Sequence, residues 1–174
     1  MGKKSKTKAE APPAVAVNLP KDADPETVAK RAAELKEQGN QAFAKNEFDV
    51  AVQAYDAAIS CFSEPKDKAA CYNNKAACYI KKQKYNDAVK ECTAALGLVP
   101  DWDKARMRRA RAYELMARND LAMTDCQELM KKAGGKPSQE LKDMDERIKN
   151  NIMQQVLKLQ QQHQAQQAAN GGKG

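Results

Sequence analysis

Histidine and aromatic residues are scarce in this sequence. Of its 174 residues, 5% are Phe, Trp or Tyr and a single one is histidine. That residue, His163, lies in a glutamine-rich stretch with no Cys, Asp or Glu beside it, so we expect a solvated side chain. The sequence also lacks a glycine-rich phosphate loop and any spacing that would bring two carboxylates into one pocket. We therefore predict that the protein is not an enzyme and uses no cofactor and no metal ion.

Long apolar runs are also missing. None approaches the roughly 18 residues needed to span a membrane, and the N-terminus Met-Gly-Lys-Lys-Ser-Lys has no apolar stretch behind it, as a secretory signal would. Lys6 stands where a myristoylation signal needs Ser or Thr. We predict a protein with no membrane contact that is located in the cytoplasm, with the nucleus as an alternative.

The five cysteines do not form a pattern that indicates disulfides or zinc. Their number is odd, and no pair has the C-x-x-C spacing of a metal or redox site. All fall in apolar phases of the expected helices, so we predict buried free thiols that act as small hydrophobic residues. They are Cys61, Cys71, Cys78, Cys92 and Cys126.

Lysine and arginine outnumber acidic residues by 30 to 23, which leaves a formal net charge of +7. A basic balance of this kind suits an acidic partner or a nucleic acid. One group of cations is in the N-terminal tail, and a second is internal: Lys104, Arg106, Arg108, Arg109 and Arg111. The shortage of aromatic residues for base stacking disfavours nucleic acid, but a basic scaffold that binds nucleic acid or the ribosome stays an alternative.

Small residues recur at fixed intervals in a sequence rich in helix-forming residues. Ala51, Ala88 and Ala122 follow one another at intervals of 37 and 34, and Gly39, Ala76 and Ala110 keep the same two intervals. A period of 34 with small residues at these places is typical of the tetratricopeptide (TPR) helix-turn-helix repeat, which stacks into a solenoid with a concave binding face. We predict an all-α fold of three such repeats in a right-handed solenoid, followed by a C-terminal capping helix.

Changes in composition predict four segments. Residues 1–23 are rich in Lys, Ala and Pro and are expected to be disordered. Asp24-Pro25 is a helix start and opens the three-repeat domain at 24–133. Residues 134–160 form a capping or interaction helix, and the Gln- and Gly-rich residues 161–174 are again expected to be disordered.

The segment 134–160 has one amphipathic stripe, which recurs at intervals of three and four residues. The end of a solenoid needs a polar cap, so we expect this helix to cover the last repeat, away from the first helices of the repeats. Self-association or partner binding through the same stripe is the alternative. The stripe consists of Leu141, Met144, Ile148, Ile152, Val156 and Leu159.

Five polar residues share one stripe on the first helices of the three repeats. Counted from Gly39, Ala76 and Ala110, they fall at offsets near −6, −3 to −2 and +1, which lie on one helix face. Lysines, an arginine and asparagine amides that converge in this way suit a carboxylate-rich ligand. The five are Lys36, Asn40, Asn74, Lys104 and Arg108.

These residues resemble the motifs of the carboxylate-clamp TPR domains of Hsp70/Hsp90 co-chaperones, such as the Hsp70/Hsp90-organising protein and UNC-45. The family pattern is Lys-x-x-Gly-Asn, then Tyr-x-Asn, then Lys-x-x-x-Arg, and this chain matches it with Lys36 to Asn40, Tyr72 to Asn74 and Lys104 to Arg108. The resemblance covers residues 30–133. It implies an adaptor that binds the C-terminal Glu-Glu-Val-Asp tail of Hsp90, of Hsp70 or of both. An unrelated internal peptide is a further alternative.

Seven other positions are expected to line the same groove. Some offer an apolar wall for the valine of such a tail, although packing between repeats is an equal interpretation for Phe43 and Ile80. Others are polar and would add contacts to the ligand. The positions are Phe43, Asn73, Ala77, Ile80, Lys81, Met107 and Arg111.

Overall fold

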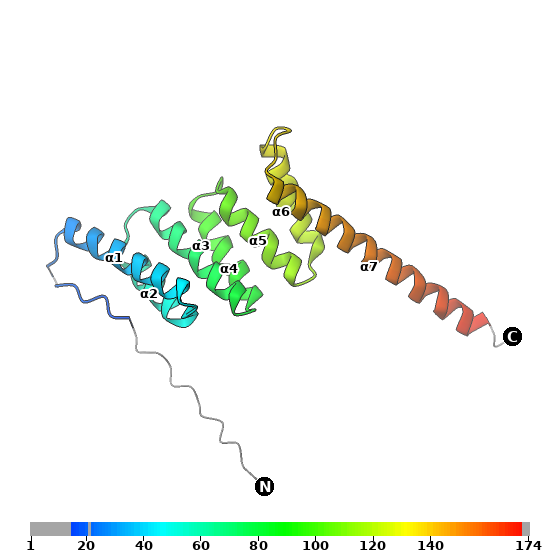
Figure 1. Cartoon of the computed structure of the whole chain (residues 1–174), viewed down its shortest axis with the longest axis horizontal. Helices are drawn as coiled ribbons and strands as arrows, with labels where there is room; N and C mark the ends of the chain where they lie inside the picture. Colours follow the sequence, from blue (N-terminus) through cyan, green and yellow to red (C-terminus); the bar gives the residue numbers. More distant parts are fainter. Residues whose placement is uncertain (1–14, 21, 172–174) are drawn as a thin grey trace, which may run out of the picture.

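A computed structural model describes residues 15–20 and 22–171. Within these residues the fold is all-helical, with seven α-helices and no strand (Figure 1). Successive helices pack in pairs, α1 on α2, α3 on α4 and α5 on α6, and neighbouring pairs stack into a solenoid. The helices are α1 (Pro25–Ala44), α2 (Phe48–Cys61), α3 (Pro65–Lys81), α4 (Tyr85–Leu98), α5 (Asp103–Leu115), α6 (Asn119–Lys132) and α7 (Gln139–Gly171).

Capping side chains fix the starts of α1 and α7. The Asp24 carboxylate accepts hydrogen bonds from the backbone N–H and the hydroxyl of Thr27, with Pro25 at the first helical position. At α7 the backbone N–H of Leu141 donates to the Ser138 hydroxyl at 3.3 Å. The sequence analysis predicted the helix start at Asp24-Pro25.

Each helix pair is joined by a tight turn with one residue in the left-handed region. These residues are Asn46 (φ 62°), Gln83 (φ 58°) and Ala117 (φ 56°). They recur at the same two intervals as the small core residues. The repeat therefore extends to the backbone conformation of the turns.

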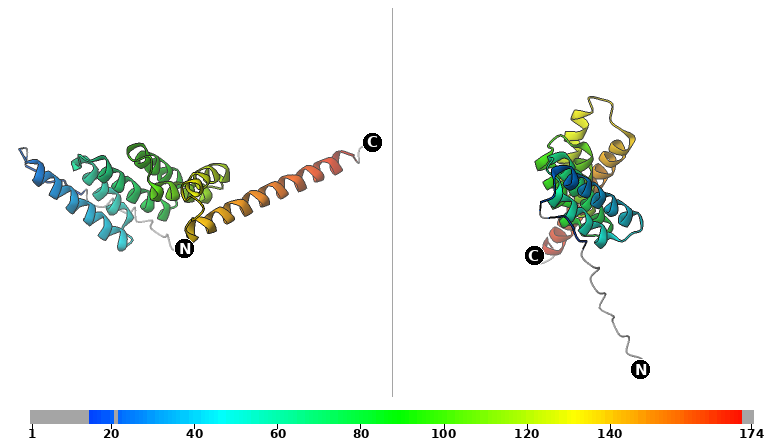
Figure 2. Two further views of the ribbon diagram at one scale, coloured as in Figure 1. Left: turned by 90° about the horizontal axis from the view of Figure 1, so that it is seen from above. Right: turned by 90° about the vertical axis from the view of Figure 1, so that its left-hand side faces the viewer.

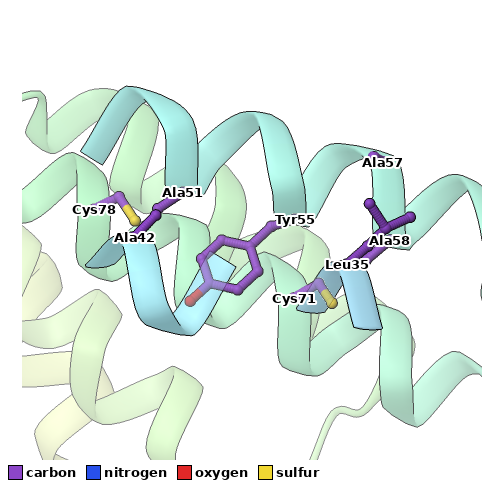
Figure 3. Packing of buried hydrophobic residues seen from close by; sticks show 8 residues of the cluster. All are labelled: Leu35, Ala42, Ala51, Tyr55, Ala57, Ala58, Cys71 and Cys78. Atoms are coloured by element: carbon purple, nitrogen blue, oxygen red, sulfur yellow. The ribbon is translucent and has the colours of Figure 1, made fainter. Parts of the chain in front are cut away.

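The core is built mainly from alanine and cysteine rather than large side chains. In the first part of the solenoid Leu35 and Tyr55 are the large members of a cluster that includes Cys71 and Cys78 (Figure 3). Tyr55 packs against Gly39, where a Cβ would lie 2.6 Å from Cε1 of the ring. Small residues thus allow helices to approach closely enough to bury an aromatic ring between them.

Residues 15–20 are not separate from the domain, which corrects the predicted boundary of the N-terminal tail at residue 23. Val15 and Val17 pack against the core of the first helix pair. Arg31 on α1 donates from Nε to the Val17 carbonyl at 2.8 Å and from Nη2 to the Ala16 carbonyl at 3.0 Å. Residues 1–14, for which disorder was also expected, lie outside the described residues.

Helix α7 has two different halves. Leu141, Met144 and Ile148 are buried against α6 and α5, as expected for a cap. The C-terminal half of the helix projects away from the solenoid (Figure 2), and Met153 and Leu159 are 60% and 65% exposed.

The same helix continues to Gly171, so it does not end near residue 160, where we expected a disordered tail to begin. The physical reason is that this segment is rich in glutamine and alanine, which favour a helix even without tertiary contacts. Residues 172–174 lie outside the described part. None of the described helices is long and apolar enough to cross a membrane.

Candidate carboxylate-binding groove

Asn40 connects the first two helix pairs at the predicted site. Its Oδ1 accepts hydrogen bonds from the Tyr55 hydroxyl at 2.9 Å and from Nδ2 of Asn74 at 3.3 Å. Its own Nδ2 donates to Glu37 at 3.0 Å. Two amides from different repeats, predicted to act together, therefore touch each other, and a buried tyrosine holds one of them in place.

Lys36 lies one turn before Asn40 on α1 and already has an acidic neighbour. Its Nζ is 3.6 Å from Oδ1 of Asp67 on α3 and 5.4 Å from the centre of the Phe62 ring. The lysine and Asp67 also border a depression of about 510 Å³, lined in part by Val28 and Cys61. Asp67 is not among the residues predicted from the sequence, although its place in the first turn of α3 is favoured by the helix dipole.

Arg108 is anchored by the backbone of the neighbouring pair. Its Nη1 donates to the Asn73 carbonyl at 2.6 Å. Burial lowers the pKa of its guanidinium, but an arginine keeps its charge in a protein. Lys104, one turn earlier, is exposed and makes no ion pair among the described residues. The two cations thus differ, since a backbone carbonyl holds the Arg108 guanidinium whereas the Lys104 side chain is exposed.

Both residues line an open groove of about 940 Å³ between α5 and α7. Three of the seven additional positions predicted from the sequence, Ile80, Met107 and Arg111, line it too. The remaining members of the lining are Asp103 and three residues of α7, namely Glu140, Met144 and Arg147. We had expected α7 to lie away from the clamp face, and this is wrong, because α7 provides one wall of the groove.

The other four predicted positions differ in their surroundings. Asn73 is 4% exposed, so its side chain is buried and does not line a groove, which corrects that prediction. Phe43 packs edge-on against Phe48, with ring centroids 5.6 Å apart, in agreement with the packing interpretation. Ala77 is half-buried and Lys81 is exposed, and neither borders the two depressions described above.

Acidic partners compensate much of the internal basic cluster. Arg109 makes a two-pronged contact with the buried Asp125, from Nε at 2.8 Å and from Nη2 at 2.7 Å. Arg106 lies 3.7 Å from the same carboxylate. Arg111 donates to Glu114 at 2.6 Å. Within the described part of the chain, Lys104 and Arg108 are thus the members of this cluster without an acidic partner, which disfavours a broad nucleic-acid surface here.

No protein-family model matches the chain. Among curated proteins, it is 33% identical over 103 residues to the mitochondrial import receptor subunit TOM34 of Rattus norvegicus, covering 56% of this chain and 33% of that protein. It is 35% identical over 94 residues to protein unc-45 homolog B of Xenopus tropicalis, covering 54% of this chain and 10% of that protein. The chain therefore spans a third or less of the length of these two relatives.

Solved structures of TPR domains have the same fold. The Sgt2 TPR domain from Aspergillus fumigatus superposes with a TM-score of 0.65 at 25% identity, covering 72% of this chain and 81% of that one. The second TPR domain of human RPAP3, in complex with the HSP70 peptide SGPTIEEVD, superposes with a TM-score of 0.62 at 26% identity, covering 72% and 98%. The chain thus carries a tetratricopeptide-repeat domain of the Hsp70/Hsp90 co-chaperone type.

Proposed function

We propose that this chain is a co-chaperone-type adaptor that binds the acidic Glu-Glu-Val-Asp tail of Hsp90, of Hsp70 or of both through a carboxylate clamp. The observation that carries the proposal is the contact between Asn40 and Asn74, which joins α1 to α3 beside Lys36. In this arrangement Lys36, Asn40 and Asn74 hold the terminal carboxylate. Lys104 and Arg108 bind the side-chain carboxylate of the last residue.

The chemistry of the groove agrees with this assignment. Charge-assisted hydrogen bonds to carboxylates are stronger than neutral ones, and a guanidinium grips a carboxylate with two parallel bonds. The Asn73 carbonyl uses one of the five donors of Arg108 and fixes the direction of the guanidinium. A fixed cation loses little side-chain entropy when the ligand arrives.

When a ligand carboxylate binds, Lys36 has to leave Asp67 or contact both carboxylates at once. The side chains of Lys36 and Asp67 are 31% and 44% exposed, and an ion pair of that kind contributes at most about 1 kcal/mol. A terminal carboxylate that also accepts from two amides would therefore compete with Asp67 successfully.

The comparisons support the same class of ligand. The RPAP3 domain was solved with an HSP70 peptide that ends in Glu-Glu-Val-Asp, and its fold covers most of the helical part of this chain. A partner of this kind would place the protein in the cytosol, in agreement with the sequence-based prediction.

The proposal is tested by calorimetric titration with Ser-Gly-Pro-Thr-Ile-Glu-Glu-Val-Asp, as the free acid and as the C-terminal amide. The amide should bind at least about tenfold more weakly, because it removes a charge held by charge-assisted bonds. Lys104→Ala should weaken binding of the acid by about tenfold without changing the melting temperature.

The matched control for Lys104→Ala is Lys90→Ala, an exposed lysine on α4, which should leave the affinity unchanged. Equal affinity for acid and amide would instead favour recognition of an internal peptide and would exclude the clamp. Loss of folding in the Lys104 variant would mean that this lysine is structural.

A further inference from the structure

Each wall of the groove between α5 and α7 is formed by residues on one face of a helix, and these residues have the same spacing on both helices. On α7, Glu140, Met144 and Arg147 follow at intervals of four and three residues, so they lie on one face. On α5 the residues Lys104, Arg108 and Arg111 do the same. Arg147 contacts Glu114 near the end of α5, and Gln155 contacts the carbonyl of Ala117 just beyond it. The two helices therefore advance in the same direction along the groove.

At the far end of these stripes two arginines share one buried carboxylate. Arg147 donates from Nε to Oε1 of Glu114 at 3.0 Å, and Arg111 donates from Nη1 to Oε2 at 2.6 Å. The side chain of Glu114 is only 6% exposed, whereas those of Arg111 and Arg147 are 43% and 48% exposed. The hydrogen bond to Glu114 also raises the pKa of Arg147. The carboxylate thus lies beneath two guanidiniums that stay accessible.

This arrangement has a net positive charge and spare donors. One carboxylate between two guanidiniums leaves one positive charge, and each bond to Glu114 uses one of five N–H donors. Both arginines are held by their hydrogen bonds to Glu114, so their remaining N–H donors are pre-oriented for an anion at the groove surface. Such preorganisation reduces the entropy cost of binding.

Charge also varies along the groove. Asp103 and Glu140 line the end where α5 and α7 begin, and the two arginines lie about two helical turns further, roughly 10 Å along the axis. The apolar side chains Ile80, Met107 and Met144 complete the lining. Lys104 and Arg108, assigned above to the last residue of the ligand, lie between these two ends. A further acidic side chain of the ligand would be repelled by Asp103 and Glu140 and attracted by the two arginines. The groove therefore favours one direction of an acidic peptide.

Building on the proposed function, we propose that Arg111 and Arg147 form a second carboxylate subsite. It binds a glutamate side chain upstream of the clamped terminus, while the aliphatic residue next to it rests on Ile80 and Met107. The acidic peptide is favoured as occupant because the subsite continues from Lys104 and Arg108 on the same face of α5. In this interpretation α7 is part of the specificity of the domain as well as its cap.

The test uses the full chain and two free-acid peptides. One is Ser-Gly-Pro-Thr-Ile-Glu-Glu-Val-Asp, and the other has both glutamates replaced by glutamine. Arg147→Gln should weaken binding of the first peptide by about fivefold, as expected for a partly exposed charged contact, and binding of the second by less than about twofold. The control Lys149→Gln alters an exposed lysine of α7 that pairs with Asp145, and it should change neither affinity.

The deciding quantity is the ratio of the two peptide affinities within one variant, because partial loosening of α7 would affect both peptides alike. An equal loss for both peptides, or no loss for either, would overturn the second subsite. If the unmodified chain does not distinguish the free acid from the amide of the first peptide, the proposed function fails, and the subsite fails with it. A clear preference for the acid, combined with an unchanged ratio in Arg147→Gln, contradicts the subsite alone.

Discussion

Gly39 shows how a single residue couples the core to the proposed clamp. It lies beside Asn40, and a Cβ at this position would come within 3 Å of three atoms of the Tyr55 ring. The hydroxyl of the same ring donates to Asn40. The absence of a side chain at residue 39 therefore sets the position of Tyr55, and through it the orientation of an amide that we assign to the ligand.

We expect Gly39→Ala to destabilise the domain and to weaken peptide binding. Overpacking a rigid core costs about 1–3 kcal/mol, while replacing glycine by alanine in a helix gains about 0.5–1 kcal/mol, so the net loss should be about 1–2 kcal/mol. Urea unfolding measures the stability, and calorimetry with the free-acid peptide measures the affinity.

Gly97 provides the matched control for this substitution. It also lies in a helix, α4, but an added Cβ would meet nothing within 4 Å. Gly97→Ala should therefore stabilise the domain slightly and leave the affinity unchanged. If both variants change the stability and the peptide affinity by the same amounts, the contact with Tyr55 does not exclude a larger side chain at position 39.

At the scale of elements, the first half of α7 packs against the last helix pair and the second half is exposed. Ile148 is fully buried against the last helix pair, whereas Val156 is 44% exposed two turns further along. Both belong to the apolar stripe that is visible in the sequence. The stripe by itself does not reveal that the solenoid ends between them.

Ile148→Ala should lower the free energy of unfolding by about 2–5 kcal/mol, the usual cost of truncating a buried aliphatic side chain to alanine. Val156→Ala removes a similar group from an exposed position and should change stability by less than about 0.5 kcal/mol. Thermal or urea unfolding of the two variants checks this. A comparable loss in both would indicate that the outer half of α7 is also covered in solution, for example by a second copy of the chain.

At the scale of the whole molecule, buried thiols recur along the solenoid. Cys71 and Cys78 on α3, Cys92 on α4 and Cys126 on α6 are all fully buried and free. Burial raises their pKa from 9.0 to about 12, 11, 12 and 11. Cys61 is less buried than these four. The prediction of buried free thiols is confirmed for the four.

Because of these thiols, the fold should lose stability as the pH becomes alkaline. Above pH 9 the unfolded chain loses thiol protons that the folded chain retains, so the free energy of unfolding falls as pH rises towards 11 or 12. Urea unfolding at pH 8 and pH 10, with a reducing agent present, should show this decrease. In Cys92→Ala the decrease should be smaller by about 1 kcal/mol, the contribution of one thiol over about one pH unit above 9. If Cys92→Ala and the unmodified protein show the same pH dependence, the Cys92 thiol does not stay protonated in the folded state at pH 10.

Local patterns in the sequence were sufficient to predict an all-helical repeat fold and the helix face that the residues of the proposed clamp share. The starts of α1 and α7 follow from Asp24 and Ser138, and the repeat places Asn40 and Asn74 on the same face of successive first helices. Their contact follows because the first helices of neighbouring pairs face the same side of the solenoid. The sequence also reports which residues share a helix face, since that depends only on neighbours three and four positions away.

Only the tertiary structure decided which charges are compensated and where α7 lies. Asp67 on α3 pairs with Lys36 on α1, and Arg147 on α7 pairs with Glu114 on α5, so the partners of each pair come from different helices. Asn73, on the predicted polar stripe, is buried instead. Such contacts depend on the distance and angle at which helices dock, and these are set by side-chain volumes in the core, such as the space that Gly39 leaves for Tyr55. The packing angle between two helices cannot be predicted from the periodicity of either one, because it depends on residues that are far apart in the chain.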